Sequence, residues 1–173
     1  MDDLKLKIRT IPDYPKPGIQ FRDITTLLAD PQAFNEVMDL FVKRYQDERI
    51  DLVVGIESRG FILGAPLALR LGKGFIPVRK EGKLPGPTFG VDYDLEYGTD
   101  RVEVHKDAIP LGSRVLMVDD LLATGGTIGG SSRLIEKAGG IIVGYAFLIE
   151  LVDLKGRNNL DHPIFSLVNF EGE

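Results

Sequence analysis

Apolar positions follow helical spacing most clearly in the segment that begins at Pro31. Asp30 is a favoured N-cap residue, and proline is favoured at the first position of a helix. The apolar residues three or four positions apart are Phe34, Val37, Met38, Phe41 and Tyr45, and Val42 widens the stripe. The pattern predicts a helix from Pro31 to about Tyr45 with one buried face.

Short apolar runs alternate with helix-like segments in the rest of the chain. Runs typical of buried strands lie at 51–55, 74–78, 115–118, 141–149 and 164–168. Helices are expected at 60–71 and 127–138. The first is apolar nearly all round, so we expect it deep in the core, with Pro66 starting its regular part near Ala65 or kinking it. Strands that alternate with helices predict an α/β fold, a doubly wound and mostly parallel sheet with helices on both faces.

Two segments carry weaker patterns. We expect residues 2–9 to form a short helix and residues 11–18 to be irregular, because three prolines interrupt the second segment. Residues 79–100 combine glycine, proline and scattered charge, with only local alternation near 91–96. Long connections of this kind in compact domains tend to be functional, so we predict a mobile lid loop at 79–100.

Composition excludes several classes of function. The 173 residues suit one domain, 1–173, and 43% hydrophobic with 27% charged residues is ordinary for a soluble protein. A net charge of −5 argues against nucleic-acid binding. The chain has no cysteine, which excludes disulfides, thiolate metal sites and cysteine nucleophiles. Since no apolar run reaches membrane-spanning length and no signal peptide begins the chain, we expect a cytoplasmic protein without membrane contacts.

Candidate chemistry is concentrated where the predicted strand 115–118 ends. It runs directly into Asp119 and Asp120, which are followed by the turn Thr124-Gly-Gly-Thr127 and a predicted helix. Carboxylates accept hydrogen bonds from sugar hydroxyls, while the N–H groups of a glycine turn at a helix N-terminus bind phosphate. A ribose with a 5′-phosphate carries both kinds of group, so this segment predicts a phosphoribosyl site.

The segment 115–127 resembles the 5-phosphoribosyl-1-diphosphate (PRPP) motif of type I phosphoribosyltransferases. Leu121-Leu-Ala123 before the glycine turn, and Arg79-Lys-x-Gly-Lys-Leu-Pro-Gly86, resemble the adenine-specific members. One departure is Gly129-Gly-Ser-Ser132, an unusually flexible sequence for the helix below the phosphate loop. The resemblance implies the type I fold with a lid loop and an N-terminal base-binding segment. It also implies transfer of the phosphoribosyl group from PRPP to adenine in purine salvage, giving AMP and diphosphate, with Mg²⁺ carried by PRPP near Asp119, and a homodimer.

The resemblance assigns roles to individual residues along the PRPP site. Asp119 and Asp120 bind the ribose hydroxyls. The 5′-phosphate lies against Ala123, Thr124, Gly125, Gly126 and Thr127. The turn after the strand 51–55 has a cis peptide between Glu57 and Ser58, which exposes N–H groups to the diphosphate. Cations for the diphosphate come from Arg59, Arg79, Lys80 and Lys83, and one of these residues acts across the dimer interface.

The base and the chemical step are assigned to two further segments. Glu96, in the lid, is the candidate catalytic residue, since a carboxylate can stabilise an oxocarbenium-like ribose or move a proton on adenine. The sequence does not distinguish these two roles. Gln20, Phe21 and Arg22 are the candidate base-binding residues, because an extended backbone offers a C=O and an N–H to the edge of adenine, and Phe21 can pack on its ring.

Two alternatives remain open at the level of sequence. A phosphoribosyltransferase for hypoxanthine, guanine or xanthine needs only one reversal of donor and acceptor at the base. A regulator that senses PRPP and binds nucleic acid could keep the same fold, but it usually has a basic face or an added domain, and this chain is acidic.

Overall fold

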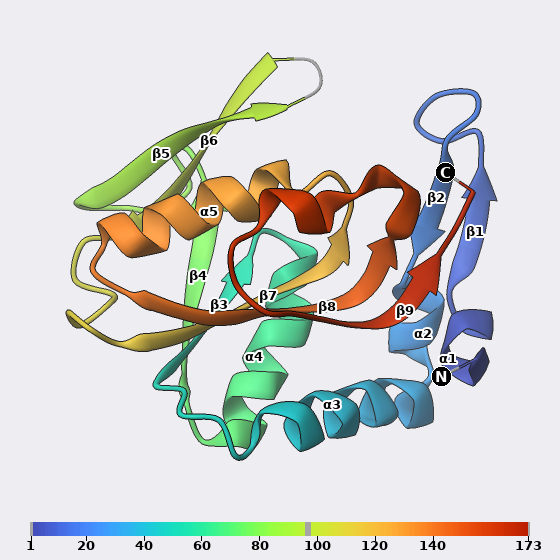
Figure 1. Cartoon of the computed structure of the whole chain (residues 1–173), viewed down its shortest axis with the longest axis horizontal. Helices are drawn as coiled ribbons and strands as arrows, with labels where there is room; N and C mark the ends of the chain where they lie inside the picture. Colours follow the sequence, from blue (N-terminus) through green and yellow to red (C-terminus); the bar gives the residue numbers. More distant parts are fainter. Residues whose placement is uncertain (1, 96–97, 173) are drawn as a thin grey trace.

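The protein was analysed as a computed structural model that describes residues 2–95 and 98–172. Its centre is a seven-stranded sheet in the order β5-β6-β4-β3-β7-β8-β9 (Figure 1). The parallel strands are β3 (Leu52–Ile56), β4 (Gly74–Lys80), β7 (Arg114–Leu122), β8 (Ile141–Leu151) and β9 (Ile164–Phe170). The strands β5 (Thr88–Leu95) and β6 (Gly98–His105) complete one edge as an antiparallel hairpin. The predicted α/β class and the mostly parallel sheet are therefore confirmed.

Helices cover both faces of this sheet. α3 (Pro31–Tyr45) and α4 (Arg59–Leu71) lie on one face, and α5 (Gly126–Lys137) lies on the other (Figure 1). Each face has its own cluster of buried apolar side chains. The predicted start of α3 is confirmed, because the Asp30 side chain accepts hydrogen bonds from the backbone N–H groups of Gln32, at 3.0 Å, and Ala33, at 3.2 Å.

The expectation that the helix at 60–71 lies deep in the core is wrong for one of its faces. Leu63 and Leu67 are fully buried, but Ile62 is 43% exposed and Leu69 is 81% exposed. The helix is continuous from Arg59 to Leu71, with Pro66 inside it, so the regular part does not start near Ala65. A single helix layer on this face of the sheet leaves the outer side of α4 open.

The N-terminal segment forms more regular structure than its prolines indicated. The helix α1 (Asp2–Leu6) ends before residue 9, because β1 (Arg9–Pro12) pairs with β2 (Gln20–Asp23) from Arg9↔Asp23 to Pro12↔Gln20. The expected irregular segment therefore begins after Pro12. The short helix α2 (Thr25–Ala29), which the sequence did not predict, follows β2.

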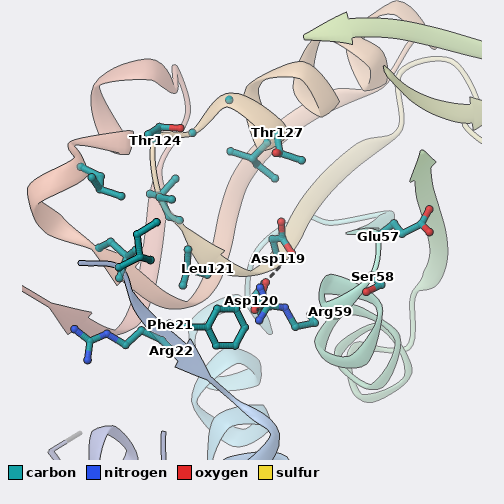
Figure 2. Close-up of a pocket in the computed structure, with 18 of the residues that line it drawn as sticks. Phe21, Arg22, Glu57, Ser58, Arg59, Asp119, Asp120, Leu121, Thr124 and Thr127 are labelled. Carbon is teal, nitrogen blue, oxygen red and sulfur yellow. Dashed lines mark hydrogen bonds and ion pairs between the residues drawn. The ribbon is translucent and has the colours of Figure 1, made fainter. Parts of the chain in front are cut away.

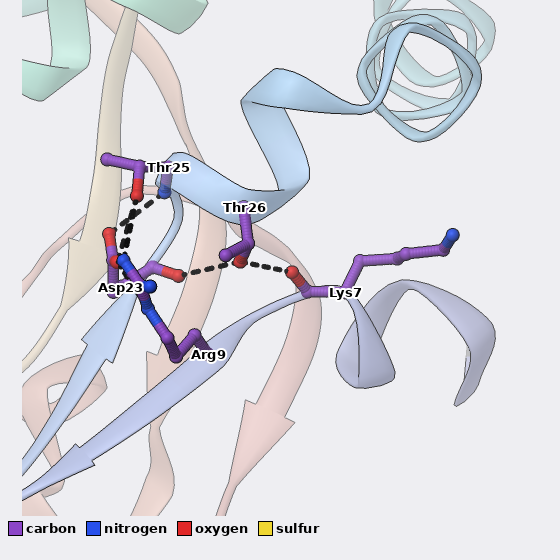
Figure 3. A network of polar contacts seen from close by, with 5 residues as sticks. All are labelled: Lys7, Arg9, Asp23, Thr25 and Thr26. Carbon is purple, nitrogen blue, oxygen red and sulfur yellow. Dashed lines mark hydrogen bonds and ion pairs between the residues drawn. The ribbon is translucent and has the colours of Figure 1, made fainter.

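A polar network ties this ribbon to the domain (Figure 3). Asp23 accepts hydrogen bonds from Arg9 Nε, at 3.0 Å, and from the backbone N–H of Thr25, at 2.9 Å. The Thr26 hydroxyl donates to the carbonyl of Lys7 at 2.6 Å. The Thr25 N–H outweighs the effect of burial and lowers the pKa of Asp23, with help from Arg9. The network therefore fixes both strands next to the site described below.

The irregular loop expected at 79–100 is largely a hairpin. β5 and β6 pair continuously from Thr88↔His105 to Leu95↔Gly98. Tyr93, Val102 and Val104 are buried, so the alternation seen near 91–96 is the inner face of a real strand. The sequence missed it because its glycines and prolines lie mainly in the connection before β5.

The remaining elements differ from prediction mainly at their ends. β7 extends four residues beyond Val118 to Leu122, and the short helices η1 (Val152–Leu154) and η2 (Gly156–Asn159) follow β8. No helix in the described ranges is long and apolar enough to cross a membrane.

Candidate active site

A cleft of about 890 Å³ lies at the carboxyl ends of the parallel strands. Its walls come from β2, the turn between β3 and α4, the end of β4, the hairpin strand β5, and the segment from β7 into α5. Figure 2 shows the side chains of Phe21, Arg59, Asp119 and Asp120 close together, with Thr124 and Thr127 of the segment from β7 into α5 above them. Clefts in doubly wound sheets form at this edge, so the fold itself places the site.

The acid pair projects into the cleft because the two neighbours of β7 have different lengths. Pairing between β3 and β7 ends at Gly55↔Val118, whereas pairing between β8 and β7 continues to Leu122↔Glu150. Asp119 and Asp120 therefore lie inside β7, beyond the end of β3. The sequence had indicated that they follow the strand. Asp119 is half-buried and Asp120 is 5% exposed.

The two carboxylates share a strongly desolvated environment. Burial raises the pKa of Asp119 well above its usual value, and the charge of Asp120 raises it further. Burial also raises the pKa of Asp120, although the nearby Arg59 opposes this effect. Arg59 Nε lies 2.9 Å from Asp120 Oδ2, yet this buried oxygen has no hydrogen bond. The pair therefore offers acceptor oxygens to a ligand and holds protons more readily than ordinary aspartates.

We predict that PRPP affinity falls as the pH is lowered, and that the fall begins above the pH at which ordinary aspartates take up protons, about 3.9. Protonation removes acceptors for ribose hydroxyls, and the raised pKa values of Asp119 and Asp120 move that loss to higher pH. Because the folded protein holds these protons more tightly than the unfolded chain does, the unliganded protein gains stability as the pH falls through the raised pKa values. Titration of PRPP binding against pH measures the effect.

The matched control for this prediction is the Asp119→Asn, Asp120→Asn double variant. It should bind PRPP more weakly and keep only the pH dependence of the PRPP phosphates themselves. Full affinity in the double variant would contradict a role of the acid pair in ribose binding.

The glycine turn places the N-terminus of α5 against the cleft. Gly125 has φ +86°, and the helix begins at Gly126, so the first N–H groups of α5 have no acceptor within the helix. The carbonyl of Gly156 lies 2.9 Å from where a Cβ of residue 125 would be. Asn159 Nδ2 donates to the carbonyl of Thr124 at 2.7 Å, so η2 holds the turn from behind. All five predicted phosphate-loop residues, 123–127, line the cleft.

The turn after β3 has the geometry that the resemblance implied. The peptide between Glu57 and Ser58 is cis, which confirms that expectation. The Glu57 carboxylate accepts hydrogen bonds from Arg79 Nε and Nη2, both at 3.2 Å, and from the N–H of Lys80 at 2.9 Å. Although burial alone raises the pKa of Glu57, these donors lower it on balance. Glu57 therefore anchors the turn to the end of β4.

The predicted diphosphate cations divide into two groups. Arg59 and Lys80 line the cleft together with Ser58, whereas Arg79 and Lys83 do not. Arg79 is engaged with Glu57, and its Nη1 also donates to the carbonyl of Lys83 at 3.3 Å. Within the described residues, Arg79 thus supports the turn from outside the cleft.

The predicted base-binding residues enter the cleft from β2. Gln20, Phe21 and Arg22 all line it. The Phe21 ring packs edge-on against Tyr14, with centroids 5.3 Å apart, and Arg59 Cζ lies 5.3 Å from its centroid. The Arg22 guanidinium points elsewhere, over the Phe170 ring at 4.2 Å, so its main chain is the part available to a base. Glu96 lies outside the described residues.

Sequence reasoning missed several residues that line the cleft. They are Tyr93, Asp94, Leu151 and Leu154, besides the apolar neighbours of the acid pair. The alternation near 91–96 was the available signal for Tyr93. Leu151 and Leu154 gave none, because only the tertiary contact between η1, η2 and the phosphate loop brings them there.

The family follows from a match that spans most of the chain. Residues 23–169 match the model of the phosphoribosyl transferase domain family. The chain belongs to this family. The matched range includes the turn after β3, the acid pair and the glycine turn, while the predicted base-binding residues 20–22 precede it.

Individual relatives cover nearly all of this phosphoribosyl transferase. The adenine phosphoribosyltransferase of Chloroflexus aurantiacus is 59% identical over 169 residues, which are 97% of this chain and 98% of the relative. The crystal structure of adenine phosphoribosyltransferase from Thermoanaerobacter pseudethanolicus has a TM-score of 0.95 at 53% identity, covering 98% and 99% of the two chains. The Saccharomyces cerevisiae enzyme, complexed with an imino-altritol bisphosphate and adenine, has a TM-score of 0.91 at 43% identity, covering 95% and 96%.

Proposed function

We propose that this protein transfers the 5-phosphoribosyl group of PRPP to adenine, forming AMP and diphosphate in purine salvage. The observation that carries the proposal is the meeting of an acid pair, a helix N-terminus and a cis-peptide turn in one cleft. The 59% identity to an adenine phosphoribosyltransferase over nearly the whole chain supports adenine as the base. The reacting unit is the single domain 1–173, with 115–127 as its PRPP motif.

The ribose 5-phosphate part of PRPP lies along β7 and α5. Asp119 and Asp120 accept hydrogen bonds from the 2′ and 3′ hydroxyls, for which Asp120 Oδ2, a buried oxygen without a hydrogen bond, is suited. The 5′-phosphate lies on the backbone of 123–127, where the N-terminal N–H groups of α5 and the hydroxyls of Thr124 and Thr127 donate to it. These contacts fix the sugar relative to the base.

The diphosphate lies at the turn after β3. The cis peptide between Glu57 and Ser58, with Arg59 and Lys80, faces this part of the cleft. Arg79 stabilises the turn, and Lys83 acts at the rim or across a subunit interface. Carboxylate and phosphate oxygens are the ligands that Mg²⁺ prefers, and Asp119 lies where Mg²⁺ on the diphosphate could contact it. Bound Mg²⁺ would neutralise negative charge on the leaving group.

Adenine lies against β2. The main chain of Gln20 and Arg22 supplies the donor and acceptor for its edge, and Phe21 packs on its ring. Displacement of diphosphate from C1 leaves positive charge on the ribose, and Glu96 stabilises this charge or handles the proton of the base.

We further propose a homodimer in the cytoplasm. The outer face of α4 exposes Ile62 and Leu69, two turns apart with Ala65 between them, which gives an apolar stripe suited to a second copy. A sedimentation mass of one chain would contradict the dimer, and cell fractionation tests the location.

Diphosphate release from PRPP and Mg²⁺ with adenine, hypoxanthine, guanine and xanthine in parallel tests the reaction. We expect turnover with adenine alone. Turnover with a 6-oxopurine instead would keep the mechanism and move the specificity. Tight PRPP binding without turnover of any base would favour a PRPP sensor.

A further inference from the structure

The hairpin β5–β6 places an aspartate next to a cation of the cleft. In its register Tyr93 lies directly opposite Asp100, and Lys80 of β4 lies opposite Val102 of β6. Residues opposite or two apart on adjacent strands point to the same face, so Tyr93, Asp100 and Lys80 meet on one side of the sheet. The backbone pairing itself sets this arrangement.

Both carboxylate oxygens of Asp100 accept hydrogen bonds. Its Oδ2 accepts hydrogen bonds from Lys80 Nζ and from the Tyr93 hydroxyl, the latter at 3.1 Å, and its Oδ1 accepts from the N–H of Arg101 at 2.8 Å. The hydrogen bond with Lys80 lowers the pKa of Asp100, and in turn raises the pKa of Lys80. Both groups are therefore charged at neutral pH. The Lys80 side chain is 51% exposed, against 24% for Asp100, so the lysine is the partner with freedom to move.

Tyr93 packs against α5 at Gly130, within the segment Gly129–Ser132. A Cβ on Gly130 of α5 would lie 2.7 Å from Tyr93 Cβ, so glycine allows the hairpin to pack directly on the helix. Ser131 and Ser132 turn their hydroxyls back to the carbonyls of Thr127, at 2.9 Å, and Ile128, at 2.7 Å. The Tyr93 hydroxyl also bonds to the Thr127 side chain of the phosphate loop. Asp100 thus belongs to a rigid support.

We propose that Asp100 is an internal counter-ion that competes with the diphosphate for Lys80. In the empty cleft the carboxylate holds the ammonium group at the rim, next to the site of the leaving group. When magnesium diphosphate or PRPP binds, Lys80 turns from Asp100 to the ligand. The inference rests on the diphosphate role proposed above for Lys80.

This competition predicts the sign of a substitution. A carboxylate that merely supports the site would weaken ligand binding when it is lost. A competing anion does the opposite, because its removal frees the ammonium group and removes a negative charge beside an anionic ligand. Asp100 then makes Mg²⁺-diphosphate easier to release after the reaction.

The test is direct binding of magnesium diphosphate to the full chain by calorimetry. Asp100→Asn should tighten binding about three- to fivefold, the range expected for an exposed ion pair. In a Lys80→Met background the same substitution should tighten binding less, because only the repulsion by the Asp100 charge is then removed, and the difference makes a double-mutant cycle. Asp92→Asn is the matched control: Asp92 lies on the same hairpin but pairs with Arg101, 2.9 Å away, so its loss should not tighten binding.

Weaker or unchanged binding in Asp100→Asn would overturn the inference, as would an equal gain in Asp92→Asn. Asp100→Ala serves as the second variant if the asparagine variant fails to fold. If Lys80→Met alone binds diphosphate as tightly as the parent protein, the role of Lys80 is wrong and the inference falls with it. Turnover of adenine by the unmodified protein is a separate test of the proposed reaction.

Discussion

Replacing Glu96 with glutamine should lower the turnover number by about a hundredfold or more, while PRPP affinity changes little. The substitution keeps the size of the side chain and removes its charge. The proposed ground-state contacts of PRPP lie elsewhere, at the acid pair, the phosphate loop and the turn after β3, which line the cleft. A carboxylate that acts only when positive charge develops on the ribose, or when a base proton moves, contributes to the transition state alone. Steady-state turnover and equilibrium PRPP binding separate the two effects.

The control for Glu96 is Asp92→Asn, which removes one negative charge from an exposed position of the same hairpin. Its turnover should match that of the parent protein. Equal loss of turnover and of PRPP affinity in Glu96→Gln would make Glu96 a structural residue of the predicted lid.

The residues predicted at the centre of the site line one cleft, because they are close together in the chain. Asp119, Asp120 and Thr124–Thr127 lie within nine consecutive residues, and the strand before them and the helix after them fix their geometry. The turn at Glu57 follows another short buried strand. Because parallel strands end at one edge of a sheet, two such turns in neighbouring strands must lie close together.

The parts that escaped prediction depend on contacts between distant segments. The hairpin β5–β6 is stabilised by cross-strand pairing and by packing on α5. Its glycine-rich local sequence did not indicate these contacts. Leu151 and Leu154 reach the cleft only because Gly156 and Asn159 pack against the phosphate loop. The sequence predicted that the outer face of α4 is buried because apolar residues surround the helix, although only one side of the helix meets the sheet.

Arg59 shows how tertiary structure changes the meaning of a residue that the sequence identified. It was expected as a cation for the diphosphate. In the structure its Nε lies 2.9 Å from Asp120, and its guanidinium stacks near Phe21 of the base-binding strand. One side chain therefore connects the turn after β3, the acid pair and β2.

The second large effect is expected from Gly125→Ala, which should weaken PRPP binding by roughly ten- to a hundredfold, the equivalent of about 1–3 kcal/mol. Gly125 has φ +86°, where a side chain is strained, and its Cβ would lie 2.9 Å from the carbonyl of Gly156. The turn can relieve both problems only by rotating its peptides. Rotation moves the N–H groups at the start of α5 away from the phosphate. Calorimetry with PRPP measures the loss.

Gly129→Ala is the matched control, four residues further along and outside the cleft lining. Its added Cβ would find its nearest neighbours at 3.9 and 4.0 Å, an ordinary contact, and its backbone is helical. Alanine in place of a helical glycine stabilises by about 0.5–1 kcal/mol, so the melting temperature should rise by roughly 1–4 °C with PRPP affinity unchanged. The same substitution would then weaken PRPP binding at Gly125 and leave it unchanged at Gly129. If Gly125→Ala keeps full PRPP affinity, the phosphate does not depend on the conformation of this turn, and its proposed position on the helix N-terminus is wrong.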